Sequence, residues 1–176
     1  MLYCNLIGYT YREGTKKGGN TVKGIKNSSG LIDNQTLIIE PVFKDKVKTR
    51  IVTTHGTYYS EESTLNLLED ACNRFASTLE GRLKATKKLM NYSVKTPLLI
   101  EPNDFGAFPT MSYRNPECVW IFNHPFYVVE LSKGISVIHF LNGISVTVNA
   151  SKHVLLKQHQ RLHTSLNIYG MYHRKK

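Results

Sequence analysis

The sequence predicts an α+β domain with mainly antiparallel strands, a helix near residues 61–90 and a basic C-terminal helix after a β-hairpin. Short runs rich in β-branched and aromatic residues recur between residues 37 and 148, separated by Gly, Pro and Asn, which is typical of short strands. Apolar residues at helical spacing occur near 61–90 and 152–166. With 176 residues and 41% hydrophobic content, the chain is long enough for one domain with a buried core.

The chain is strongly basic. It contains 23 Lys and Arg against 13 Asp and Glu, so its formal net charge is +10. Such a charge attracts polyanions, and nucleic acid is the commonest of them, with an acidic protein or a membrane surface as alternatives. No apolar run is long enough to span a bilayer, and residues 1–11 lack the features of a secretion signal. We therefore expect a cytoplasmic protein without a membrane partner.

Residues 1–35 are predicted to form a flexible basic arm. Gly and Lys are frequent between residues 11 and 29, where apolar residues show no periodicity. The Gly-rich run at 14–19 lacks the Gly-x4-Gly-Lys-Ser/Thr spacing of a phosphate-binding loop. We interpret this segment as an arm that could strengthen nucleic-acid binding through phosphate contacts.

Ordered structure is expected to begin near Thr36. Residues 37–39 and 49–54 are β-rich runs, and the charged segment 44–48 separates them. They predict two strands of one sheet.

The helix near 61–90 is predicted to start at Ser60, with Glu61 and Glu62 in its first turn. Its apolar face consists of Leu65, Leu68, Cys72, Phe75 and Leu79. Gly81 interrupts this face and predicts a kink or a break between two helices. The basic residues that follow are Arg82, Lys84, Lys87 and Lys88. Because Lys84 and Lys88 are one turn apart, they indicate a basic patch, although a merely solvated helix face is an alternative.

The segment from residue 97 to residue 129 is dense in apolar and aromatic residues. It contains five prolines, which predict short strands joined by turns and argue against a long helix. The residues of interest here are Phe108, Cys118, Trp120 and Phe122. In a β context we expect them to pack in the core, while an aromatic recognition platform is the alternative.

The last quarter of the chain, residues 131–176, predicts a β-hairpin followed by a basic helix. Strand-like alternation flanks Asn142-Gly143, a pair typical of a type I′ turn. Ser151 can cap a helix over 152–166, whose basic residues are Lys152, Lys157 and Arg161, and a basic tail follows at 169–176. This quarter contains seven Lys and Arg and no Asp or Glu. It therefore indicates an anion-binding platform more than an ordinary solvated charge run.

The sequence predicts no catalytic site, metal site or cofactor. His159 and His163 are one helical turn apart, but no Glu lies between them and no acid follows Glu130. The two Gly-Ile-Ser-Val runs lack the Gly-x-Ser-x-Gly spacing of a nucleophile elbow. The cysteines are Cys4, Cys72 and Cys118. Because they are far apart and odd in number, they indicate neither a zinc pair nor a disulfide framework.

Several of these motifs together resemble the family of the competence transcription factor ComK of Gram-positive bacteria. The run Gly106-Ala107-Phe108-Pro109-Thr110-Met111-Ser112, followed by Cys118-Val119-Trp120-Ile121, is similar to the family pattern Phe-Pro-Thr-x-Ser, a short loop, and Cys-x-Trp-Ile. Other positions that agree in order and spacing are Cys72, Gly81-Arg82, Pro97, Ile100, Pro102, Asn142-Gly143, Ser151, Gln158 and Arg161. On this basis residues 36–168 are interpreted as a ComK-like DNA-binding domain.

The resemblance implies a non-enzymatic, sequence-specific DNA-binding activator of genes for DNA uptake and recombination. It would bind paired A/T-rich boxes of double-stranded DNA through the minor groove, as a dimer or a pair of dimers. RNA polymerase and a protease adaptor are further partners that the resemblance implies, in a nucleoid-associated cytoplasmic location. Charge alone does not distinguish this function from an RNA-binding or ribosome-associated module.

We expect the DNA contacts at the basic residues of the two helices. These are Arg82, Lys84, Lys87, Lys88, Lys152, Lys157 and Arg161. The narrow, strongly negative minor groove of an A-tract attracts Arg and Lys side chains. Two of these residues have a structural alternative: Arg82 could support the junction at Gly81, and Arg161 could pair with an acid such as Glu101 or Glu117.

Overall fold

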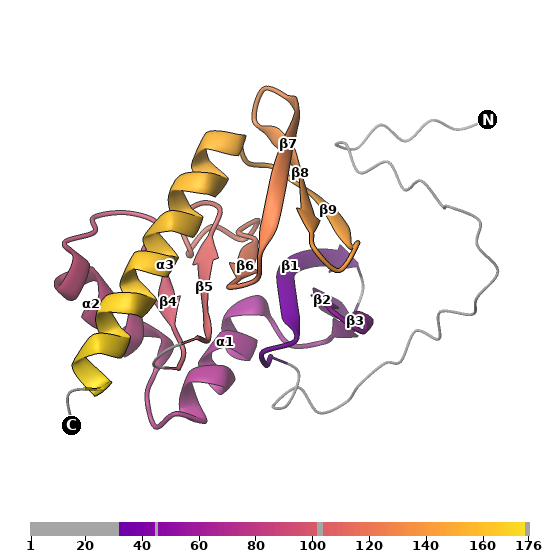
Figure 1. Cartoon of the computed structure of the whole chain (residues 1–176). Coiled ribbons are helices and arrows are strands. Elements are labelled where there is room, and N and C mark those ends of the chain that lie inside the picture. The colour runs from indigo at the N-terminus through magenta and orange to yellow at the C-terminus, as the bar shows by residue number, and fades with distance from the viewer. Residues whose placement is uncertain (1–31, 45, 102–103, 175–176) are drawn as a thin grey trace, which may run out of the picture.

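The computed structural model of the chain describes residues 32–44, 46–101 and 104–174. In chain order these residues form β1 (Thr36–Lys44), β2 (Val47–Thr53), β3 (Gly56–Ser60), α1 (Thr64–Asn73), α2 (Leu79–Met90), β4 (Leu98–Leu99), β5 (Gly106–Pro109), β6 (Trp120–Phe122), β7 (Phe126–Ser132), β8 (Ile135–Phe140), β9 (Ser145–Val148) and α3 (Lys152–Arg174) (Figure 1). All paired strands in these ranges are antiparallel. The predicted α+β class is therefore confirmed.

A central six-stranded sheet separates two hydrophobic cores. Its strand order is β3-β2-β1-β6-β5-β4. Successive side chains alternate between the faces, so Ile39 and Trp120 belong to one core while Ile38 and Ile121 belong to the other. Helices α1 and α2 cover the first face, and the three-stranded sheet β7-β8-β9 together with α3 covers the second (Figure 1). The basic helices α2 and α3 thus belong to opposite layers.

Strands β1 and β2 confirm the two strands that the sequence predicted. Strand β1 continues past Pro41, which pairs with Thr49 of β2. On its other side β1 pairs with β6 only at Ile38 and Ile39, so Pro41 needs no N–H there. Strand β3 was not predicted, and Ile32, which lies before the expected start of order, is already buried in the first core. Of the predicted arm, residues 1–31 lie outside the described residues.

The predicted helix near 61–90 consists of two helices, and its predicted start was wrong. Ser63 caps α1, with its Oγ accepting a hydrogen bond from the Asn66 N–H at 3.2 Å. Ser60 instead ends β3 as a buried residue, because its backbone pairs with Thr49 of β2. The two glutamates that follow it therefore precede α1 and do not lie in its first turn.

The break between α1 and α2 lies at residues 74–78, ahead of Gly81. Thr78 caps α2, and its Oγ1 accepts from the Gly81 N–H at 3.0 Å. The Leu79 N–H donates to Glu69 Oε2 of α1 at 2.7 Å, which joins the two helices. A Cβ at Gly81 would lie 2.9 Å from Thr78 Oγ1. The predicted break exists, but this glycine makes room for the cap of α2 and does not itself interrupt the helix.

The C-terminal hairpin of β8 and β9 is confirmed, but its predicted turn type was wrong. The Gly143 N–H donates to the Phe140 carbonyl at 3.0 Å, and the Phe140 N–H donates to the Ile144 carbonyl at 2.8 Å. Gly143 has φ of +87°, while Asn142 does not have a positive φ. The connection is therefore a three-residue loop with glycine in the left-handed position, whereas a type I′ turn requires two positive φ angles.

Helix α3 starts as predicted but is longer than predicted. Ser151 Oγ accepts from the Val154 N–H at 3.4 Å, at the expected cap. The helix then continues beyond residue 166 and through the buried Gly170 to Arg174. Most of the predicted basic tail is consequently helical, and residues 175–176 lie outside the described residues.

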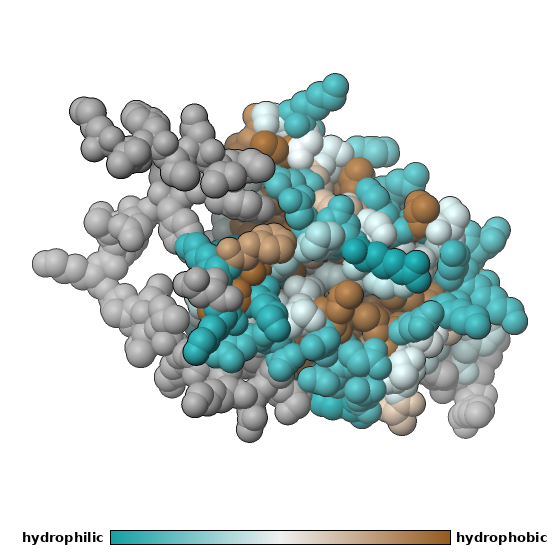
Figure 2. All heavy atoms as spheres, turned by 180° about the vertical axis from the view of Figure 1, so that it is seen from behind, coloured by the Kyte–Doolittle hydropathy of each residue, from teal (hydrophilic) through white to brown (hydrophobic). Residues whose placement is uncertain are grey.

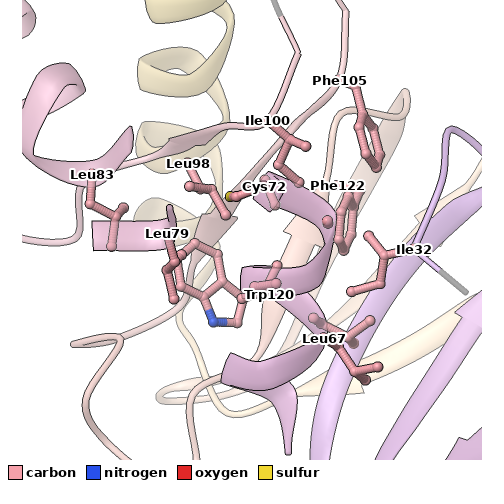
Figure 3. Packing of buried hydrophobic residues seen from close by; sticks show 14 of the residues in the cluster. Ile32, Leu67, Cys72, Leu79, Leu83, Leu98, Ile100, Phe105, Trp120 and Phe122 are labelled. Carbon is pink, nitrogen blue, oxygen red and sulfur yellow. The ribbon is translucent and has the colours of Figure 1, made fainter. Parts of the chain in front are cut away.

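The aromatic and thiol residues of the family pattern are core residues, as expected. Trp120 is 0% exposed, and Figure 3 shows it among Leu79, Cys72 and Leu98 of the first core. Phe108, Phe122 and Cys118 are also buried. Cys72 and Cys118 are free, and burial raises the pKa of each thiol to about 11. Both thiols are therefore protonated at neutral pH; Cys4 lies outside the described residues.

Candidate nucleic-acid interface

The fold brings the two basic helices together although they lie far apart in the sequence. Both α2 and α3 pack against β4, and Figure 1 shows them side by side. Arg82 Nη1 of α2 donates to Tyr169 Oη of α3 at 2.8 Å. The two basic helices therefore meet at the β4 edge of the sheet.

The lysines of both helices are exposed, and we call them together the basic surface: Lys84, Lys87, Lys88, Lys152 and Lys157. Within the described ranges none of them forms an ion pair, and the ion pair found there joins Arg50 Nε to Glu40 Oε1 at 2.5 Å. Glu80 is the one acid of α2, and α3 contains none. The charges of the basic surface are thus available to an external anion.

Helical geometry arranges these lysines unevenly. Lys84 and Lys88 share one face of α2, whereas Lys87 lies on a neighbouring face. On α3, Lys152 and Lys157 lie near the N-terminal end, and an exposed strip of polar side chains follows them along the helix. These are Gln160, His163, Thr164 and Asn167. The strip can donate and accept hydrogen bonds while the two lysines meet phosphates.

Arg82 is held inside the protein. It is half-buried, and besides Tyr169 it contacts the junction of α1 and α2, where Nη2 donates to the Phe75 carbonyl at 3.2 Å. The structural role considered for Arg82 therefore has direct support. A contact between Arg82 and DNA stays a prediction.

Arg161 connects α3 to the segment between α2 and β4 through a hydrogen bond and a ring contact. Its Nη1 donates to the Val94 carbonyl at 3.0 Å, and its Cζ lies 3.7 Å from the centroid of the Tyr92 ring. Gln158, with its amide oriented to suit its neighbours, accepts from Arg161 Nη1 at 3.0 Å and donates to the Lys95 carbonyl at 2.8 Å. Carbonyl groups and a ring hold this guanidinium.

The acids proposed as partners of Arg161 were wrong. Neither Glu101 nor Glu117 forms an ion pair with it in the described structure. Tyr92 and Tyr169, which sequence reasoning missed, hold the two arginines. The available signal was indirect: an arginine on a helix without a nearby acid requires some other partner if it is to be ordered.

We expect Arg82→Met to lower the free energy of unfolding by about 1–3 kcal/mol, because Tyr169 Oη and the Phe75 carbonyl lose a charged donor. Urea unfolding followed by circular dichroism measures this loss. The matched control is Lys84→Met, an exposed position on the same helix, which we expect to change stability by at most about 0.5 kcal/mol. A stable Arg82→Met protein that loses only its preference for A/T-rich duplex would instead identify Arg82 as a groove contact.

His159 and His163 lie next to each other, and burial keeps His159 from adding charge to this side. Their Nε2 atoms are 2.9 Å apart, and the His159 ring lies against Phe126 with 4.4 Å between centroids. Burial, together with His163, lowers the pKa of His159 to about 4. His159 is therefore neutral at neutral pH. Among the described residues no group of three or more His, Cys, Asp and Glu is placed to hold a metal ion.

Comparisons with known proteins complete the description. A family model described as "ComK protein" matches residues 5–175. The chain is similar to a competence transcription factor of Bacillus subtilis (strain 168), with 28% identity over 92 residues, which cover 51% of this chain and 48% of that protein. The chain thus spans about half the length of the curated relative it matches, and no solved structure matches it significantly. In the described part of the chain, no helix combines the length and apolar character required to cross a membrane.

Proposed function

Because the chain belongs to the ComK family, we propose that it is a competence transcription factor that binds double-stranded DNA through the basic surface of α2 and α3. One observation carries this proposal: the fold joins two helices from opposite layers, and their exposed lysines have no ion-pair partners among the described residues. Exposed lysines without ion-pair partners, carried by helices that are packed against the sheet, can bind phosphates.

Within this proposal the lysines and the arginines have different roles. Lys84, Lys88, Lys152 and Lys157 contact phosphates from the faces defined above, and Lys87 contributes from a neighbouring face. Arg82 and Arg161 position the helices, since Nη1 and Nη2 of Arg82 donate to Tyr169 and Phe75 and Nη1 of Arg161 donates to Val94. This division changes the expectation from the sequence, in which both arginines contact DNA.

Recognition of A/T-rich boxes through the minor groove is the finer part of the proposal. An A/T-rich minor groove is narrow and negative, so it concentrates cations near its walls. The lysines and the polar strip of α3 supply the charge and the hydrogen-bonding groups that such recognition uses. The proposed targets are genes for DNA uptake and recombination. RNA polymerase and a protease adaptor are proposed further partners, in a nucleoid-associated cytoplasmic location.

Self-association as a dimer or a pair of dimers is also part of the proposal. The outward side of β7 exposes Tyr127, Val129 and Leu131, which are uncharged. Val129 lies opposite Val137 of β8 in the sheet register. In a chain of net charge +10, a face on which apolar side chains gather suits a second copy, because contact there brings fewer like charges together.

A competition assay across a salt series tests the DNA-binding function. We expect A/T-rich duplex to compete better than G/C-rich duplex and structured RNA. The log-log salt slope should be roughly −4 to −5, since each of about five phosphate contacts contributes about −0.9. A slope near zero would contradict binding to any polyanion. Structured RNA that competes best would favour the alternative of an RNA-binding or ribosome-associated module.

A further inference from the structure

A groove on the α1 side of the central sheet has no role in the proposed DNA binding. Its volume is about 360 Å³, and its walls come from the end of β1, the start of α1 and the loop between β5 and β6. Pro41, Phe43, Leu65 and Pro116 make these walls apolar. Figure 2, the view from behind, shows hydrophobic surface among hydrophilic side chains on the described part of the protein. Cys118 and Trp120, which belong to the Cys-x-Trp-Ile part of the family pattern, also line the groove.

The base of the groove contains an unpaired donor. Trp120 is 0% exposed, and its Nε1–H has no hydrogen-bond acceptor within the described part of the chain. In Figure 3 this nitrogen lies on the ring edge that points away from Cys72 and Leu98. Buried donors in folded proteins are almost always paired. The indole N–H therefore indicates a ligand acceptor at this place, which can reach the buried N–H only after side chains of the lining move aside.

The surroundings of this donor favour a negatively charged acceptor. The lining includes the first residues of α1, a ten-residue helix whose first turn contains no acid, although Glu62 before it accepts a hydrogen bond from Asn66 Nδ2 at 2.9 Å. The N–H groups at a helix start carry partial positive charge. Lys48 and Arg114 add two full positive charges, while the neighbouring acids Glu62 and Glu117 are not among the lining residues. A carboxylate attached to apolar groups would match the walls, the charges and the indole N–H together.

The free edge of β1 indicates the shape of the occupant. Strand β1 pairs with β6 only at Ile38 and Ile39, so its part from Glu40 to Lys44 has no strand on that side in the described structure. Phe43 in this part is 74% exposed. Pro41 provides no N–H on this edge and a bulge follows it, so a pairing strand would have to use the residues after Pro41. Beside apolar pockets, such an edge can bind an extended peptide.

We infer that this groove is a docking site for an extended segment of a partner protein that carries a carboxylate between apolar side chains. The segment runs along the free edge of β1, places apolar side chains against Phe43 and Leu65, and directs its carboxylate to the Trp120 indole N–H and the start of α1. This inference goes beyond the proposed DNA binding and does not depend on it.

Trp120 is the only tryptophan of the chain, so its indole N–H gives a single resonance in a 1H–15N NMR spectrum. The probes are the capped peptide acetyl-Val-Leu-Glu-Ile-Val-amide, its twin with Gln in place of Glu, and 3-phenylpropionate. We expect the glutamate peptide to shift the indole resonance to saturation. The glutamine twin should bind at least about tenfold more weakly, because a charged acceptor makes the stronger hydrogen bond.

Charge reversal at the lining provides matched variants. Lys48→Glu and Arg114→Glu, both exposed positions, should each weaken the glutamate peptide by about tenfold while the melting temperature stays unchanged. Lys133→Glu, at the turn between β7 and β8 in the opposite layer, reverses a charge outside the lining and should leave peptide binding within about threefold of wild type. Duplex DNA binding is measured on the same proteins. A protein that binds duplex DNA but not the peptide contradicts the docking site alone and leaves the proposed DNA binding intact.

Four results would overturn the inference. They are the absence of any saturable shift, equal binding of the two peptides, tighter binding of 3-phenylpropionate than of the glutamate peptide, and peptide binding only after removal of residues 1–31. The third would make the groove a site for small organic acids. The fourth would assign it to the chain's own N-terminal segment.

Discussion

Trp120→Ala is expected to lower the free energy of unfolding by about 3–5 kcal/mol, a large part of the 5–15 kcal/mol that is typical of folded domains. Trp120 is fully buried on β6, a strand that pairs with β1 on one side and β5 on the other. Its ring packs against Leu79 and Cys72 of the helical layer (Figure 3). Truncation would leave a cavity where the sheet meets α1 and α2. Urea unfolding followed by circular dichroism measures the loss.

Two further variants make this test specific. Trp120→Phe keeps most of the ring and should cost less than Trp120→Ala. Tyr127→Ala removes an aromatic ring that is 57% exposed on β7, and we expect it to change stability by no more than about 1 kcal/mol. If Trp120→Ala unfolded like the wild type and lost only DNA binding, Trp120 would be a recognition residue, and its burial would contribute little to the free energy of unfolding.

The sequence predicted those parts of the fold that local patterns determine. Alternation and turn residues identified β1, β2 and the hairpin of β8 and β9, and helical spacing with Ser151 identified the start of α3. The beginning of α1 was wrong because Ser60 and Ser63 are both good caps. Pairing between β3 and β2, a tertiary contact, places Ser60 in the sheet and leaves Ser63 to cap the helix.

The candidate site shows the same division between local and distant interactions. The exposure of Lys84 and Lys157 followed from helical patterns, and the structure agrees. The surroundings of the arginines depend on contacts between distant parts of the chain: Arg82 and Tyr169 are 87 positions apart, and Arg161 and Val94 are 67 apart. No local pattern predicts such pairs. The lysines could therefore be placed from the sequence, but the residues that position them could not.

Replacing Lys84, Lys88, Lys152 and Lys157 together by Gln should lower the affinity for duplex DNA by roughly a thousandfold at 0.15 M salt. Each phosphate contact contributes about 0.9 to the magnitude of the log-log salt slope, so the loss of four contacts lowers that magnitude by about 3.6. If the four contacts contribute nothing at 1 M salt, this slope change over the range from 1 M to 0.15 M corresponds to a loss of roughly three orders of magnitude in affinity. The lysines are exposed and unpaired within the described residues, so the variant should fold normally. Fluorescence anisotropy with a labelled A/T-rich duplex across a salt series measures both quantities.

The matched control removes four charges elsewhere, at Lys44, Lys46, Lys48 and Lys133, which are exposed and lie outside α2 and α3. Because charges beyond a Debye length of about 8 Å are largely screened at physiological salt, we expect this variant to lose less than about tenfold. Equal losses in both variants would show that affinity follows net charge and would contradict the basic surface. Losses of equal size on A/T-rich and G/C-rich duplexes would identify the four lysines as phosphate contacts, and the preference for A/T-rich DNA would then reside in the polar strip of α3.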